Sequence, residues 1–166
     1  YLKNVELSGQ LLLGLINDIL DMSKIESGKL VLRQDPASLR DLLDNLSNIV
    51  SPMAEKKGLD FTLSCPDLQH DTLCFDSLRL NQVLLNLLSN AVKFTQEGGQ
   101  VRMEVAERPS PKPGQARLVF RVADNGIGMQ PEFLEHIFDS FTREQDSRVD
   151  KTEGSGLGMA IAKMIV

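Results

Sequence analysis

Apolar residues recur at helical spacings in three parts of the chain. The first run extends from Leu2 to Ile25 without a proline, the second covers residues 39–53, and the third covers residues 80–92. The pattern predicts three amphipathic helices. The apolar stripe of the first is wider than one packing seam requires, so this helix either faces a partner helix or lies along its own core.

Between these helices, apolar and polar residues alternate with the period of two that is typical of strands. The alternating segments are "KLVLRQ" (29–34), residues 59–66, residues 72–76, residues 100–107 and residues 116–124. Residues 35–38 are predicted to form a turn that caps the second helix, and either Asp76 or Ser77 is predicted to cap the third. Residues 108–115 read as a solvated hairpin loop. The order of elements predicts an α+β sandwich, a mixed sheet covered by helices on one face and preceded by one long helix.

The composition narrows the function classes. A chain of 166 residues with 42% hydrophobic residues can bury one domain-sized core. The net charge of −5 and the pI near 5.1 argue against binding to nucleic acid or to an acidic membrane, because phosphates require a basic surface. Cys65 and Cys74 lack the spacing of a metal site and are predicted to be buried free thiols.

No segment approaches the run of about 18 apolar residues that a membrane span requires, and no signal-like start is present. We therefore expect a cytoplasmic location, with any membrane anchor elsewhere in a longer parent chain.

The third predicted helix places three polar side chains on one face. Asn86, Asn90 and Lys93 are spaced i, i+4 and i+7. An amide oxygen can complete a Mg²⁺ shell made of water and phosphate oxygens, and a lysine can neutralise phosphate charge. Taken alone, such a row is more often a solvated face.

Two glycine clusters follow. Asp124 ends a predicted strand, and Gly126 and Gly128 allow positive φ and a close approach of the backbone to a bound group. A carboxylate at this point suits an exocyclic amine such as that of adenine. Three further glycines open the last predicted helix, whose backbone N–H groups can cradle an anion: Gly154, Gly156 and Gly158. The polar segment 138–153 between the clusters is interpreted as a mobile lid.

The segments "NLLSNAVKFT", "DNGIGM", "IFDSFTRE" and "GSGLGMAIA" together resemble, in this order, the N box, first glycine box, F box and second glycine box of the sensor histidine kinase ATP-binding domain. The opening "LLGLINDILDMSKIESGKL" is similar to the second helix of the dimerisation and phosphoacceptor domain of that family, especially of hybrid kinases. The resemblance implies a partial dimerisation domain over residues 1–29 and a Bergerat-type ATP-binding catalytic domain over residues 30–166. Family members normally add further strands, so part of the sheet is expected outside this sequence.

The resemblance also implies a role for individual residues. Asn90 would coordinate Mg²⁺, with Asn86 near the phosphates or the waters of the metal. Lys93 would contact the phosphates, Phe94 would lie along the adenine, and Asp124 would accept a hydrogen bond from the adenine amine. The remaining roles concern the lid and the phosphates: Gly126 and Gly128 as hinges, Phe138 and Phe141 as anchors, Arg143 at the γ-phosphate, and Gly154, Gly156 and Gly158 around the phosphates.

The sequence departs from the family at the phosphoacceptor histidine, whose motif is absent, and neither His70 nor His136 fits that role. The expected function is therefore ATP binding with Mg²⁺ and transfer of the γ-phosphate to a histidine outside this fragment. Expected partners are the phosphoacceptor domain, a response regulator receiver domain, and a second copy in the full-length protein. Three alternatives remain: a degenerate scaffold module, a serine kinase, and a gyrase-type ATPase, which would carry glutamate at position 86 as general base.

Overall fold

The computed structural model describes residues 12–13, 16–17, 19–24, 27–142 and 156–166. The chain divides into two compact units, which are described separately. One unit is continuous, from Leu32 to Met129, and the other combines Tyr1–Val31 with Gln130–Val166. The continuous unit contains the sheet and most of the buried core.

Two long helices of the continuous unit begin where the sequence predicts. Helix α2 spans Leu39–Lys56 and helix α3 spans Ser77–Phe94. The Ser38 hydroxyl caps α2 by accepting from the N–H of Asp41 at 3.1 Å. Of the two cap candidates for α3, Asp76 is the one used, and it accepts from the N–H of Arg79 at 3.0 Å.

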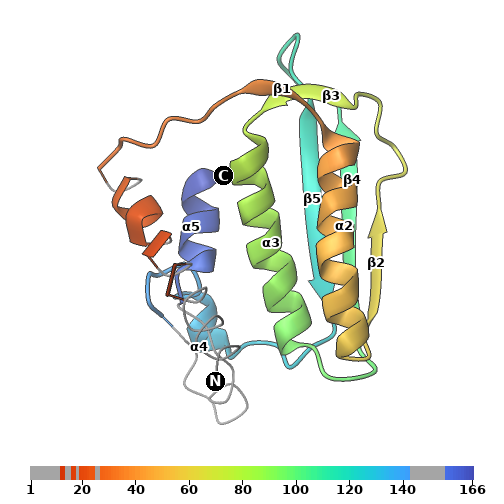
Figure 1. The fold of residues 1–166 in the computed structure, drawn as a ribbon, viewed down its shortest axis with the longest axis vertical. Helices are drawn as coiled ribbons and strands as arrows, with labels where there is room; N and C mark the ends of the chain where they lie inside the picture. Colours follow the sequence, from red (N-terminus) through yellow and green to blue (C-terminus); the bar gives the residue numbers. More distant parts are fainter. Residues whose placement is uncertain (1–11, 14–15, 18, 25–26, 143–155) are drawn as a thin grey trace. The chain divides into compact units, whose positions relative to one another are not determined.

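A three-stranded sheet lies under these helices. It comprises β2 (Asp60–Ser64), β4 (Gln100–Arg108) and β5 (Arg117–Asp124) in the order β2-β4-β5. Strand β4 is parallel to β2 and antiparallel to β5. Figure 1 shows α2 and α3 side by side over one face of this sheet. The predicted α+β sandwich with a mixed sheet is therefore confirmed.

The alternation along β4 fixes which face of the sheet is buried. Val101, Met103 and Val105 are at most 1% exposed, whereas Arg102 between them is exposed. These residues pack against the apolar stripes of both helices, among which Leu46 and Leu88 are fully buried. The core therefore holds the carboxyl end of α3 in a fixed position relative to the start of β4 and the end of β5.

Residues 29–38 differ from the prediction. Residues 29–34 form no strand, and the predicted turn is instead strand β1 (Asp35–Ser38), which pairs antiparallel with β3 (Thr72–Phe75). A strand requires a partner, and the N–H of Arg33 instead donates to the Asp76 carboxylate at 2.9 Å. Proline lacks the backbone N–H that a central strand would donate to its neighbours. Pro36 is tolerated in β1 because both strands of a two-stranded sheet are edge strands.

The cysteine prediction is wrong in part. Both thiols are free, but Cys65 is half-buried and Cys74 is exposed. Cys74 lies in β3, where Leu73 and Phe75 turn toward the core, so the alternation of the strand directs the thiol outward.

The second unit contains the described part of the first predicted helix, together with α4 (Pro131–Leu134) and α5 (Gly158–Ile165). The described residues between 12 and 24 are helical, and the rest of the predicted helix lies outside the described residues. Its apolar residues Leu12, Leu13, Ile16, Ile19 and Leu20 are 43–62% exposed, whereas Met22 is buried. Within the described residues, no helix is both long and apolar enough to cross a membrane.

Candidate functional site

The polar row predicted on α3 lies on the last three turns of that helix. Asn86, Asn90 and Lys93 are all half-buried, as is Phe94 at the final helical position. The Lys93 ammonium lies over the Phe94 ring, with Nζ 5.0 Å from the ring centroid. This cation–π contact places a positive charge and an aromatic face together at the carboxyl end of α3.

The turn after β5 contacts the same end of α3. The N–H of Ile127 donates to the Phe94 carbonyl at 3.2 Å. Asp124, the last residue of β5, is exposed, and its Oδ1 accepts from the N–H of Gly126 at 2.9 Å. The structure therefore brings Asp124 and Phe94 together, although the whole β4–β5 hairpin separates them in the sequence.

Gly126 and Gly128 are required for different reasons. Gly128 has φ of +67°, as predicted, and its surroundings are open. Gly126 is not among the glycines with positive φ, so that part of the prediction is wrong for it. A Cβ atom at Gly126 would lie 2.5 Å from the Phe94 carbonyl oxygen and 2.8 Å from Asp124 Oδ1. Gly126 thus permits close approach of the turn to α3.

Asn125, which no sequence pattern singled out, anchors the turn to β4. Its side-chain Oδ1 accepts from the N–H of Gln100 at 2.7 Å, and its own N–H donates to the Gln100 carbonyl at 3.2 Å. The turn is consequently held at two points, the start of β4 and the end of α3.

Lys57 was also not predicted to contribute. Its ammonium group donates to the carbonyls of Val92 and Lys93, at 2.9 and 2.6 Å. These carbonyls belong to the last turn of α3, where the helix dipole is negative. The signal in the sequence was weak, since a lysine before Gly58 reads only as a residue at the end of α2.

The second glycine cluster belongs to the other unit. Gly156 has φ of +72°, and its carbonyl accepts from the N–H of Phe141 at 3.1 Å. Gly158 is the first residue of α5, after Leu157, which is fully buried. Gly154 and Arg143 lie outside the described residues.

The two aromatic residues predicted to anchor the lid differ from each other. Phe138 is 41% exposed and lies under the Lys163 ammonium, 5.1 Å from ring centroid to Nζ. Phe141 is 64% exposed and has φ of 61°, and its N–H donates to the Gly156 carbonyl. The role of both phenylalanines as anchors of the lid stays a prediction, because residues 143–155 lie outside the described residues.

Asn90 is the residue of the site predicted to be a donor to a metal ion. Within the described residues, no group of three or more histidine, cysteine, aspartate or glutamate side chains could hold a metal ion. The half-buried amide of Asn90 is a neutral oxygen donor of the type that Mg²⁺ accepts when phosphates and waters supply the remaining ligands. The residues present thus fit a metal that arrives with a phosphate ligand.

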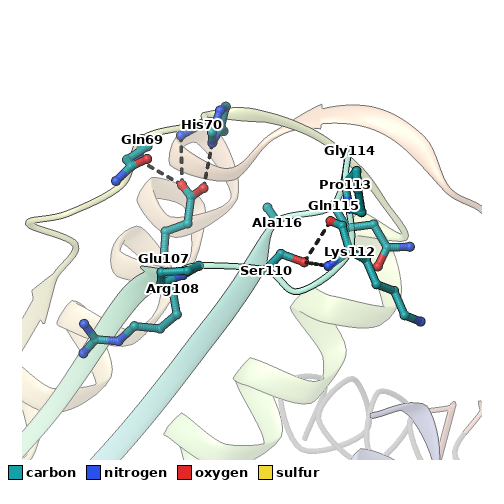
Figure 2. A pocket seen from close by; sticks show the side chains of 11 residues that line it. Gln69, His70, Glu107, Arg108, Ser110, Lys112, Pro113, Gly114, Gln115 and Ala116 are labelled. Atoms are coloured by element: carbon teal, nitrogen blue, oxygen red, sulfur yellow. Dashed lines mark hydrogen bonds and ion pairs between the residues drawn. The ribbon is translucent and has the colours of Figure 1, made fainter.

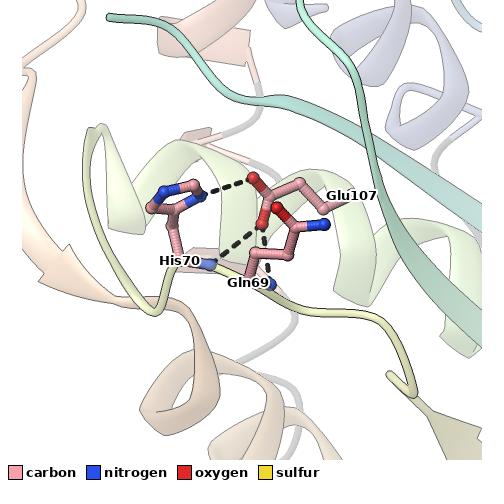
Figure 3. A network of polar contacts seen from close by, with 3 residues as sticks. All are labelled: Gln69, His70 and Glu107. Carbon is pink, nitrogen blue, oxygen red and sulfur yellow. Dashed lines mark hydrogen bonds and ion pairs between the residues drawn. The ribbon is translucent and has the colours of Figure 1, made fainter.

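A pocket of about 400 Å³ lies at the opposite end of the β4–β5 hairpin from Asp124, and none of the predicted site residues lines it (Figure 2). At its edge, Glu107 Oε1 lies 2.6 Å from His70 Nδ1. Glu107 Oε2 accepts from the N–H groups of Gln69 and His70 at 2.9 and 3.0 Å (Figure 3). These hydrogen bonds lower the pKa of Glu107, and the bond with the His70 side chain has the largest effect.

Both oxygens of the Glu107 carboxylate are thus bound by Gln69 and His70, and these contacts join the β2–β3 loop to β4. The other histidine, His136, pairs with Asp139 at 2.8 Å in the second unit.

Comparison with known proteins defines the class. The model of a family described as histidine kinase-, DNA gyrase B- and HSP90-like ATPase matches residues 75–166, and the chain belongs to this family. The match includes the α3 residues, the Asp124 turn and the second glycine cluster.

Individual relatives narrow the class further. Sensor histidine kinase GacS of Pseudomonas protegens is 40% identical over 100% of this chain and 18% of its own length. Hybrid signal transduction histidine kinase B of Dictyostelium discoideum is 39% identical over 99% of this chain and 8% of its own length. The crystal structure of full-length ShkA in complex with AMPPNP has a TM-score of 0.78 and 33% identity, and the match covers 99% of this chain and 32% of ShkA.

The chain therefore spans less than a fifth of the length of these curated relatives. The prediction that the chain contains the ATP-binding catalytic domain of a sensor histidine kinase is confirmed.

Proposed function

We propose that this chain binds ATP with Mg²⁺ and presents the γ-phosphate to a histidine outside residues 1–166. The observation that carries the proposal is the hydrogen bond from the Ile127 N–H to the Phe94 carbonyl, at 3.2 Å. It joins the proposed adenine acceptor, Asp124, to the helix that carries the proposed phosphate and metal ligands. One continuous unit thereby supplies groups suited to the base and to the phosphates.

The roles divide along the nucleotide. Asp124 accepts from the adenine amine, and Phe94 lies along the base. Lys93 and Asn86 interact with the phosphates, and Asn90 holds Mg²⁺, which supplies charge neutralisation when bound. Gly126 and Gly128 shape the turn. Arg143 is assigned to the γ-phosphate, and Gly154, Gly156 and Gly158 are assigned to the phosphates.

In the reaction, a histidine nitrogen attacks the γ-phosphorus. A nitrogen–phosphorus bond forms, the bond to the bridging oxygen breaks, and ADP leaves. The residues of this chain act mainly by positioning and by neutralising charge, because phosphoryl transfer requires little covalent chemistry from the protein.

The chain represents a small part of its relatives, so its partners are also proposals. We infer a partial dimerisation domain over residues 1–29 and a catalytic domain over residues 30–166. In the full-length protein we propose a second copy as one partner, for which the exposed apolar side chains between Leu12 and Leu20 offer a contact surface. A phosphoacceptor domain and a response regulator receiver domain follow from the histidine kinase class, as does a cytoplasmic location for this part of the protein.

The decisive experiment is calorimetric titration with AMP-PNP, with and without Mg²⁺, on the wild-type chain and two Asp124 variants. Asp124→Ala removes both the turn contact and the proposed base contact. Asp124→Asn keeps an oxygen to accept from the Gly126 N–H but replaces the second oxygen with an NH₂ donor.

If Asp124 binds the adenine amine, both variants lose affinity by at least about tenfold. In Asp124→Asn, the reason is that the side-chain NH₂ group and the adenine amine are both donors and cannot form a hydrogen bond with each other in that position. If Asp124 only forms the turn, Asp124→Asn binds like the wild type and the proposed role is wrong. Absence of binding by the wild-type chain would contradict the proposed function itself.

A further inference from the structure

The turn that joins α2 to β2 lies against the turn that joins α3 to β4. The N–H of Gly98 donates to the Gly58 carbonyl, and the N–H of Asp60 donates to the Gly99 carbonyl, both at 2.9 Å. Backbone bonds therefore fix Lys57, immediately before Gly58, beside the carboxyl end of α3. These bonds hold the backbone of Lys57, and its side chain then reaches the last turn of α3.

At this position the Lys57 ammonium satisfies two carbonyls of α3. It donates to Val92 at 2.9 Å and to Lys93 at 2.6 Å, and the residue is half-buried. The last four carbonyls of a helix lack partners within the helix, and a cation there also interacts favourably with the dipole. A charged donor to such carbonyls forms a stronger bond than a neutral one.

The next carbonyl along α3 holds the Asp124 turn. The Phe94 carbonyl accepts from Ile127, and Gly126 approaches the same oxygen so closely that a Cβ atom would overlap it. Lys57 therefore fixes residues 92 and 93, and residue 94 fixes the turn. A contiguous set of hydrogen bonds runs from the end of α2, through α3, to the residues proposed to hold the nucleotide.

We propose that Lys57 is a positioning residue for the nucleotide site. Its ammonium group sets the carboxyl end of α3, which carries Lys93 and Phe94, against the turn that carries Asp124. Lys57 itself touches no nucleotide in this scheme. The expected effect on nucleotide affinity rests on the proposed function. The coupling of Lys57 to the Asp124 turn is independent of that function.

The test uses Lys57→Met, which keeps the shape of the side chain and removes the charge and donors. The matched control is Lys56→Met, which removes the same charge from the adjacent, exposed residue. Lys57→Arg retains a cationic donor and serves as the rescue variant. Affinity for AMP-PNP with Mg²⁺ is measured by calorimetry at a temperature where circular dichroism shows each variant to be folded.

Lys57→Met is expected to weaken AMP-PNP binding by about tenfold, equivalent to about 1.4 kcal/mol, with Lys56→Met unchanged and Lys57→Arg restoring most of the affinity. A cap that only stabilised α3 would lower the melting temperature without moving the affinity of the folded protein. Unchanged affinity in Lys57→Met would therefore overturn the proposal.

Amide hydrogen exchange gives a readout that needs no ligand. In Lys57→Met, exchange is expected to accelerate at Ile127 and at Thr95, whose N–H donates to the Ala91 carbonyl, and to stay constant in β1. Unchanged exchange at Ile127 would overturn the coupling even if the wild-type chain failed to bind nucleotide. Failure of the proposed function would appear separately, as absent binding by the wild type.

Discussion

Replacing Gly126 with alanine tests whether close packing between the Asp124 turn and α3 builds the site. The added Cβ would lie 2.5 Å from the Phe94 oxygen and 2.9 Å from the Phe94 carbonyl carbon. Both are backbone atoms at a helix end, so no flexible side chain can move aside. The turn must withdraw, which breaks the Ile127 to Phe94 bond and disturbs the Gly126 to Asp124 bond.

The magnitude follows from these contacts. Two hydrogen bonds at about 1 kcal/mol each give a destabilisation of about 2 kcal/mol, within the range of about 1–3 kcal/mol for overpacking. For a chain of this size, that free energy lowers the melting temperature by about 4–8 °C. Nucleotide affinity should fall by more than about tenfold, because Asp124 moves with the turn.

Gly114→Asn is the matched control, because Gly114 lies in the loop between β4 and β5, at the opposite end of that hairpin from Asp124. Gly114 has φ of +72°, no atom lies within 4 Å of the place that a Cβ would take, and asparagine tolerates this backbone conformation better than most residues. This variant should therefore change the melting temperature and the AMP-PNP affinity only slightly. Thermal unfolding and calorimetry on both variants decide the question. Gly126→Ala with wild-type melting temperature and affinity would refute the packing argument.

Two further predictions concern acid stability and self-association. Hydrogen bonds from His70 and Gln69 lower the pKa of Glu107 in the folded protein from its ordinary value of 4.5. The stabilisation that the Glu107 carboxylate gives the folded state is therefore complete above pH 4.5 and is lost as the pH falls through the lower pKa of the folded state. Glu107→Gln should therefore reduce the free energy of unfolding in urea near neutral pH and converge with wild type in acid; a constant difference at all pH values would contradict this. The resemblance implies that residues 1–29 supply one helix of a dimerising hairpin, so we expect residues 1–166 to sediment with a concentration-independent monomer mass, and a tight dimer would disprove the expectation.

Much of the fold could be predicted because its signals are local. The apolar periodicity of α2 and α3 and the caps at Ser38 and Asp76 act within a few residues of one another. The alternation in β4 likewise follows from which side chains turn toward the core. The polar row of α3 could be placed on one face for the same reason, since helical spacing alone sets it.

Pairing between distant segments could not be predicted in this way. Residues 29–34 alternate like a strand but have no strand partner, whereas residues 35–38 contain a proline and nevertheless pair with β3. Asp76 shows why residues 29–34 do not form a strand. Its carboxylate accepts hydrogen bonds from the N–H groups of both Arg33 and Arg79, so it caps α3 and also holds residue 33. These bonds lower the pKa of Asp76 although burial raises it.

By itself, the sequence determined the helices, most of the strands and the order of the polar and glycine-rich segments, because propensity, periodicity and capping operate over short distances along the chain. The tertiary structure alone decided that Lys57 caps α3, that Gly126 is needed for close approach to Phe94, and that Asn125 anchors the turn to Gln100. Each of these contacts joins residues at least 25 positions apart or depends on backbone atoms that the sequence does not distinguish. Only packing of the core brings such groups within hydrogen-bonding distance.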